Sequence, residues 1–160
     1  MKHSLFKSFT TILFISFCHC AFPQNRPKVE WRVKKIENNK NDASLLFSFA
    51  TEKGWTLYAI NHDTLNMKIS AKIKISPNDE CYSLNGSLTA SNAITKYDDD
   101  LDLNLSYFNE TGVFSQPILV HKTCVVDVEI IYLISKQINT VAGDGGILYK
   151  MKDSMQVQLE

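Results

Sequence analysis

The chain has 160 residues and a mass of 18.2 kDa, which is room for one compact domain. Its 17 basic and 17 acidic residues cancel, and this balance argues against a nucleic-acid-binding protein, because phosphate binding needs an excess of basic residues. With 44% hydrophobic and 21% charged residues, the composition is that of a folded chain and excludes a disordered one.

Residues 1–24 have the pattern of a secretory signal peptide. Two lysines precede an apolar run at 9–17, and small and turn-forming residues follow it. The run is shorter than the ~20 apolar residues that cross a membrane, so we expect a cleaved signal, an exported mature chain at 25–160 and no transmembrane segment in it. Cys18 and Cys20 lie where a bacterial lipoprotein carries its lipid, but the preceding residues lack the usual lipoprotein pattern, which favours cleavage without lipidation.

The mature chain alternates apolar and polar residues almost throughout, as half-buried β-strands do. The alternating or apolar segments are 29–33, 45–49, 55–59, 67–75, 82–88, 101–107, 114–120, 125–134 and 155–159. Roughly seven to nine short strands separated by turns predict an all-β chain with an immunoglobulin-like antiparallel β-sandwich. A β-barrel is the alternative, because periodicity does not reveal closure. Pro117 indicates an edge strand or a bulge within its segment.

Two cysteines, Cys81 and Cys124, are left after the predicted cleavage, and an oxidising compartment would permit a disulfide between them. Alternation places Cys124 on the same face as Val126, which is expected to point inward. Cys81 alternates with Tyr82 and is therefore expected to point outward. Side chains on opposite faces do not meet without a bulge, so two separate cysteines are favoured over a disulfide or a redox pair.

Metal and cofactor chemistry has little support in the sequence. The acidic run at 98–100 invites a calcium site, but an EF-hand loop needs Gly and Glu where this chain has Leu103 and Asn109. His62 and His121 are too few and too far apart to propose a zinc site. We therefore expect no metal and no cofactor.

An ordered set of short motifs carries a resemblance to a known family. Its elements are Trp31, Gly54-Trp55-Thr56-Leu57-Tyr58, Tyr82-Ser83-Leu84-Asn85-Gly86, Phe114-Ser115-Gln116 and Tyr132. In order and spacing this set resembles the amino-terminal domain of DsbD, the thiol:disulfide interchange protein, and the related disulfide bond corrector domains. The resemblance implies an immunoglobulin-like sandwich that passes electrons to periplasmic oxidoreductases through two cysteines after a late-strand tyrosine.

The chain departs from that pattern where the family does its chemistry. After Tyr132, the two expected cysteine positions hold Ser135 and Thr140, and a hydroxyl forms no disulfide. We therefore expect no enzymatic activity and predict an exported, redox-inactive binding or accessory module. Its implied partner is a thioredoxin-like protein or a membrane-bound redox relay. Two alternatives stay open, namely thiol-disulfide exchange through a rearranged Cys81/Cys124 pair and a structural module of the cell envelope.

Overall fold

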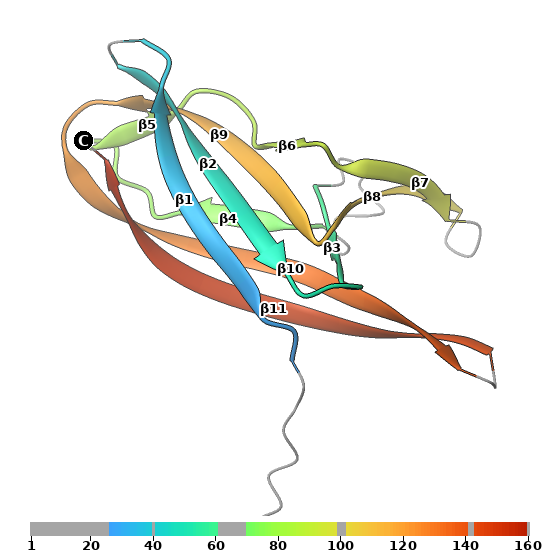
Figure 1. Ribbon diagram of the computed structural model, residues 1–160. Helices are drawn as coiled ribbons and strands as arrows, with labels where there is room; N and C mark the ends of the chain where they lie inside the picture. The colour runs from blue at the N-terminus through green and yellow to red at the C-terminus, as the bar shows by residue number, and fades with distance from the viewer. Residues whose placement is uncertain (1–25, 40, 61–69, 99–101, 141–142, 160) are drawn as a thin grey trace, which may run out of the picture.

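The computed structural model describes residues 26–39, 41–60, 70–98, 102–140 and 143–159, without the side chains of 137–145. Every regular element in these ranges is a β-strand (Figure 1). Across the described residues no helix is long and apolar enough to cross a membrane. The predicted signal at 1–24, with Cys18 and Cys20, lies outside these ranges, and so does His62.

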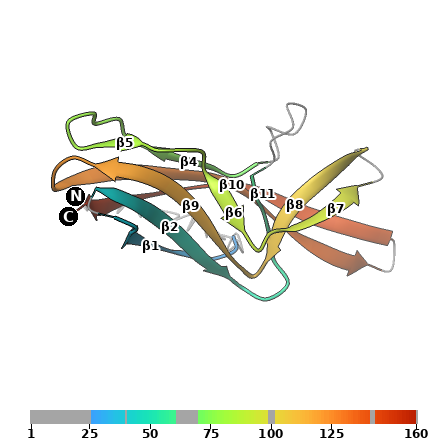
Figure 2. The same ribbon diagram turned by 90° about the horizontal axis from the view of Figure 1, so that it is seen from above.

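The strands form two antiparallel sheets, which confirms the predicted all-β sandwich. The first sheet has the order β1 (Val29–Glu37), β2 (Asp42–Thr51), β9 (Thr111–Val120) and β5 (Tyr82–Leu84), with β6 (Thr89–Ser91) also paired to β9. The second has the order β11 (Gly143–Leu159), β10 (Cys124–Thr140), β3 (Thr56–Tyr58), β8 (Leu103–Asn109) and β7 (Ile94–Asp98), with β4 (Lys72–Ile75) also paired to β10. The sheets do not close into a barrel, and the β10–β11 and β7–β8 pairs extend beyond the first sheet at one end (Figure 2).

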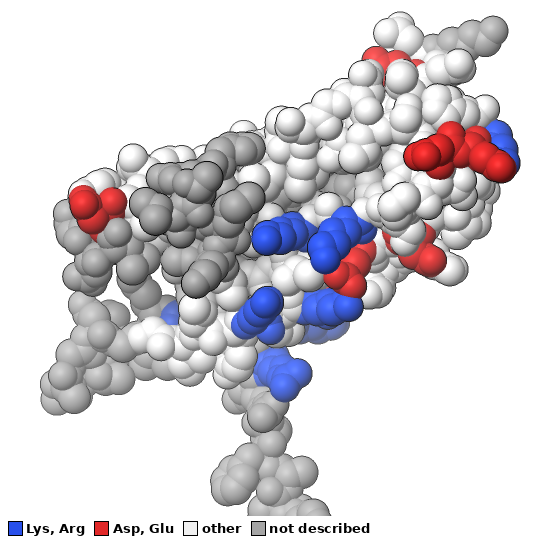
Figure 3. Space-filling model, turned by 180° about the vertical axis from the view of Figure 1, so that it is seen from behind, with Lys and Arg blue, Asp and Glu red and all other residues white. Residues whose placement is uncertain are grey.

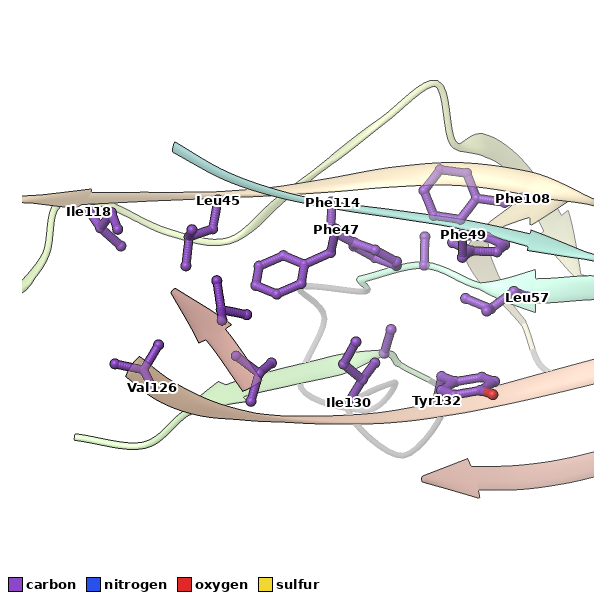
Figure 4. Close-up of a cluster of buried hydrophobic side chains, with 14 of the residues drawn as sticks. Leu45, Phe47, Phe49, Leu57, Phe108, Phe114, Ile118, Val126, Ile130 and Tyr132 are labelled. Carbon is purple, nitrogen blue, oxygen red and sulfur yellow. The ribbon is translucent and has the colours of Figure 1, made fainter. Parts of the chain in front are cut away.

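The core lies between the sheets and follows the predicted alternation. Along β2 every second residue from Ala43 to Phe49 is buried, and the residues between them are partly exposed. Figure 4 shows side chains of β2 and β9 pointing toward those of β10. Burying each large apolar side chain contributes about 1.5–3 kcal/mol, so this layer is the main source of stability. The largest fully buried residues are Leu45, Phe47, Leu57, Phe108, Phe114, Ile118, Val128, Ile130, Tyr132, Ile134 and Leu159.

Pro117 lies in β9, a central strand, so the predicted edge position is wrong. Its carbonyl accepts a hydrogen bond from the Asn85 backbone N–H at 3.0 Å, and its nitrogen faces the same side of the strand. On that side of β9, β5 pairs only with residues that follow Pro117, and β6 pairs only with residues that precede Gln116. No strand is paired with Pro117 itself on that side, so the sheet needs no backbone N–H donor there. Gly86, with φ at 131°, turns the chain between β5 and β6, so the predicted single strand at 82–88 ends early.

Candidate functional site

Cys81 and Cys124 form a disulfide, with their Cα atoms 6.2 Å apart. Cys81 immediately precedes β5 of the first sheet, and Cys124 is the first residue of β10 in the second sheet. The bond therefore joins the two layers of the sandwich at one end. Cys81 is 0% exposed, whereas Cys124 is half-buried and packs against the core.

The sequence-based placement of Cys81 was wrong for a local reason. Cys81 belongs to a turn, in which its backbone N–H and that of Tyr82 both donate to the carbonyl of Asn78, at 2.9 and 3.0 Å. Strand alternation begins only at Tyr82, so both consecutive side chains can be buried, as they are. The favoured expectation of two separate cysteines is thereby corrected.

Hydrogen bonds hold the segments on either side of the disulfide together. The backbone N–H groups of His121 and Lys122 both donate to the Cys81 carbonyl, at 2.8 and 3.3 Å. The His121 Nε2 atom lies 3.1 Å from the Ser83 hydroxyl oxygen. The Lys122 ammonium, the nearest cation along the chain to Cys124, is 2.7 Å from a carboxylate oxygen of Glu80. The disulfide is thus part of a well-connected junction between the sheets.

The two positions at which the resemblance implies cysteines, Ser135 and Thr140, lie far from this junction. Ser135 is eleven residues beyond Cys124 on the same strand, which is about 36 Å at the usual strand rise. It is partly exposed on the outer face, between Thr56 of β3 and Leu148 of β11. Thr140 is the last residue of β10 and pairs with Gly143.

The backbone at these positions does not suit a cysteine pair. Ser135 and Thr140 belong to one continuous strand, so about 16 Å separates their Cα atoms. A disulfide needs Cα atoms within about 7 Å of each other. This part of β10 therefore could not hold a disulfide between positions 135 and 140 even if both residues were cysteine.

Tyr132 is buried on the other face of β10. It is 1% exposed, and its hydroxyl donates to the Asp153 carboxylate at 2.7 Å. Burial, and secondly this hydrogen bond, raises the pKa of the Tyr132 hydroxyl well above its usual value. The Trp31 ring lies 5.4 Å from the Tyr132 ring, and the indole nitrogen of Trp31 is buried without a partner among the described residues. This group is a polar part of the core, not a surface site.

Asp153 is the member of this group that the sequence analysis missed. It lies opposite Ile130, so it faces the interior between Met151 and Met155. The available signal was a carboxylate at an apolar position of an alternating strand, which predicts a buried hydrogen-bond donor nearby.

The Gly54-to-Tyr58 motif is a turn that leads a strand into the core. Gly54 has φ at 81°, a conformation that residues with a Cβ rarely adopt. Trp55 is 6% exposed and packs against Tyr149, with ring centroids 5.8 Å apart, while Leu57 is fully buried. Trp55 is therefore part of the core, and Tyr58 is half-buried on β3.

The remaining motif residues also have structural roles. Tyr82 is buried, and its hydroxyl donates to the Ser76 carbonyl at 3.1 Å. Phe114 packs edge-on against Phe108, with ring centroids 5.2 Å apart. Gln116 donates to the carbonyl of Gly86 at 2.9 Å, which fills the gap between β5 and β6. The motif set thus describes how the sandwich is assembled.

The comparisons with known proteins add little. No family model matches the chain, and no curated protein matches it. Among solved structures, a search finds the crystal structure of the Neisseria meningitidis DsbD n-terminal domain in the reduced form, at 11% sequence identity and a TM-score of 0.41. The match covers 80% of this chain and 90% of that one.

Proposed function

We propose that this chain is an exported binding or accessory module that does not exchange disulfides. The observation that carries the proposal is the position of the Cys81–Cys124 bond, which joins the two sheets and has one sulfur-bearing residue fully buried. Export is supported by the signal-like pattern at 1–24 and by the disulfide itself, since such bonds persist in oxidising compartments.

The surroundings of the disulfide argue against catalysis. Exchange requires a thiolate to reach one sulfur and a second thiol to leave or resolve the intermediate. Cys81 has no exposed surface, so attack could come only at Cys124, and Cys81 would then be released as a thiol inside the core. Low-pKa catalytic cysteines occur in partly exposed, electropositive surroundings, whereas Lys122 beside this bond is already paired with Glu80.

Partner binding needs no cysteine in such a module. The strands β1 and β11 are at sheet edges, where main-chain groups can pair with a partner's strand. A thioredoxin-like protein or a membrane-bound redox relay is the partner class that the motif set implies, and we retain it within this proposal.

Thiol-disulfide exchange through Cys81 and Cys124 is a second candidate. One observation favours it, which is that the two residues are bonded and that Cys124 is only half-buried. The family's late-strand positions, Ser135 and Thr140, have no part in this version.

An insulin-reduction assay separates the two candidates. With dithiothreitol as the electron donor, we expect the oxidised wild-type protein to leave the rate of insulin precipitation unchanged from that of dithiothreitol alone. Cys124→Ser should behave in the same way. Acceleration by the wild type that is lost in Cys124→Ser would establish the second candidate and overturn the first.

A further inference from the structure

We propose that the outer face of the second sheet binds an acidic polypeptide segment that also carries apolar side chains. The surface, here called the lysine groove, consists of Lys72, Lys74, Lys150, Lys152, Ile131 and Leu133. This inference rests on the proposed binding function and names the surface and the chemistry of the partner.

The strand register brings these residues together from three strands. Lys72 of β4 and Lys152 of β11 both lie opposite Ile131 of β10, one on each side. Lys150 lies opposite Leu133 in the same way. Because residues directly opposite in an antiparallel ladder share a face, all of them point away from the core.

The charge of this face is unbalanced although the whole chain is neutral. Figure 3 shows lysine and arginine side chains gathered near the middle of the face seen from behind, with an acidic group between them. Glu129 pairs with Lys152 and, at 3.6 Å, with Lys74. The hydrogen bond from Lys152 lowers the pKa of the Glu129 carboxyl, which keeps it ionised.

The other two lysines are available to a ligand. Within the described part of the chain, neither Lys72 nor Lys150 has an ion-pair partner. The next acid on this face, Asp127, accepts a hydrogen bond from Gln156 at 3.1 Å and lies opposite that residue, toward the disulfide end of β10. A partner carboxylate beside Lys72 and Lys150 would therefore meet uncompensated positive charge.

The face is hollowed beside these lysines. A cavity of about 480 Å³ is lined by Ser70, Lys72, Lys74, Ile131, Tyr132, Leu133 and Lys150. It forms because β4 pairs with β10 only as far as Ile131, whereas β3 pairs with β10 from Ile134 onward. Ile131 and Leu133 are half-buried and give the hollow an apolar part.

These features favour an acidic peptide over other anionic ligands. A flat lipid surface would not reach into a hollow between strands. A polyphosphate has no apolar group that could contact the apolar part of the hollow. The two carboxylates on the face also disfavour a nucleic acid, since they would repel successive phosphates. An extended segment with alternating acidic and apolar side chains can satisfy both the lysines and the apolar part.

The test uses the full mature protein and a fluorescein-labelled peptide of alternating glutamate and leucine, followed by fluorescence anisotropy at low salt. We expect Lys72→Glu with Lys150→Glu to weaken binding by about tenfold or more, because each change replaces attraction with repulsion. The matched control is Lys34→Glu with Lys53→Glu, which alters net charge equally at exposed positions outside the groove and should bind as the wild type does. Circular dichroism melts of both variants verify folding.

The result that overturns the proposal is equal binding by both double variants, or no binding by the wild type. Preferential binding of the wild type to vesicles containing anionic lipid, with no peptide binding, would also overturn it. The insulin-reduction assay on the same samples separates the two proposals. If the wild type neither binds the peptide nor accelerates insulin reduction, only the lysine-groove proposal is overturned. If it binds the peptide and also accelerates insulin reduction, only the proposal of a redox-inactive module is overturned.

Discussion

Replacing Cys81 and Cys124 together by alanine is expected to lower the free energy of unfolding by about 4 kcal/mol. The two residues are 43 positions apart, so the bond closes a long loop and restricts the unfolded chain strongly. The lost bond also removes the covalent link between the sheets next to the buried Tyr82. Urea denaturation followed by tryptophan fluorescence measures the change.

A matched control comes from the neighbouring exposed positions. Leu84 and Val125 are 60% and 52% exposed, and they lie close in sequence to the two cysteines. Replacing both by alanine should change the free energy of unfolding by less than about 1 kcal/mol. A cysteine double variant no less stable than this control would mean that the disulfide does not hold the sandwich together.

Tyr132→Phe is expected to reduce the decrease in the free energy of unfolding that occurs at high pH. The pKa of Tyr132 is raised in the folded protein, first by burial and then by its hydrogen bond to Asp153. The stability that this group contributes is therefore fully present below the unfolded pKa of about 10 and is lost as the pH rises above it. In that range the wild type should lose about 1.4 kcal/mol per pH unit more than the Phe variant.

Urea midpoints at several pH values between neutral and strongly alkaline measure this difference. Tyr97→Phe is the control, because its hydroxyl also donates to a carboxylate, that of Asp102, but at a position that is 48% exposed. Water screens that interaction, so its pH profile should follow the wild type closely. Identical profiles for Tyr132→Phe and the wild type would show that Tyr132 ionises as readily in the folded protein as in the unfolded one.

The sequence was sufficient to predict the architecture because nearly every strand has one buried face. The alternation at 45–49 agrees with the burial of every second residue in β2, and the inward face assigned to Val126 agrees with its 3% exposure. The segment 67–75 was also predicted as a strand, and its described part forms β4 from Lys72. Alternation is a local property, and these segments keep it over several residues.

The predictions failed where the backbone leaves the ladder. Cys81 lies in a turn, so the alternation that begins at Tyr82 could not locate its side chain. Pro117 was predicted to mark an edge strand or a bulge, because one sequence does not reveal that the strand position beside β9 is divided between β5 and β6. The first error is local, because it concerns a turn of four residues that ends at Cys81. The second depends on the pairing of strands that are distant in sequence, which a single sequence does not reveal.

Of the candidate sites, the sequence indicated one and could not indicate the other. The resemblance predicted that Ser135 and Thr140 stand at two cysteine positions, and the continuous strand in this region places them too far apart for a disulfide. The lysine groove could not be predicted, because it depends on the register that aligns Lys72 and Lys152 across Ile131.

The most direct test of the central claim is the reduction potential of the Cys81–Cys124 disulfide. The oxidised protein is equilibrated in dithiothreitol buffers of graded potential, free thiols are alkylated, and the mass of the intact chain gives the fraction reduced. A structural bond at a buried sheet junction predicts a midpoint below about −300 mV. A midpoint between about −270 and −120 mV, where catalytic dithiols operate, would contradict the account and indicate a redox-active protein.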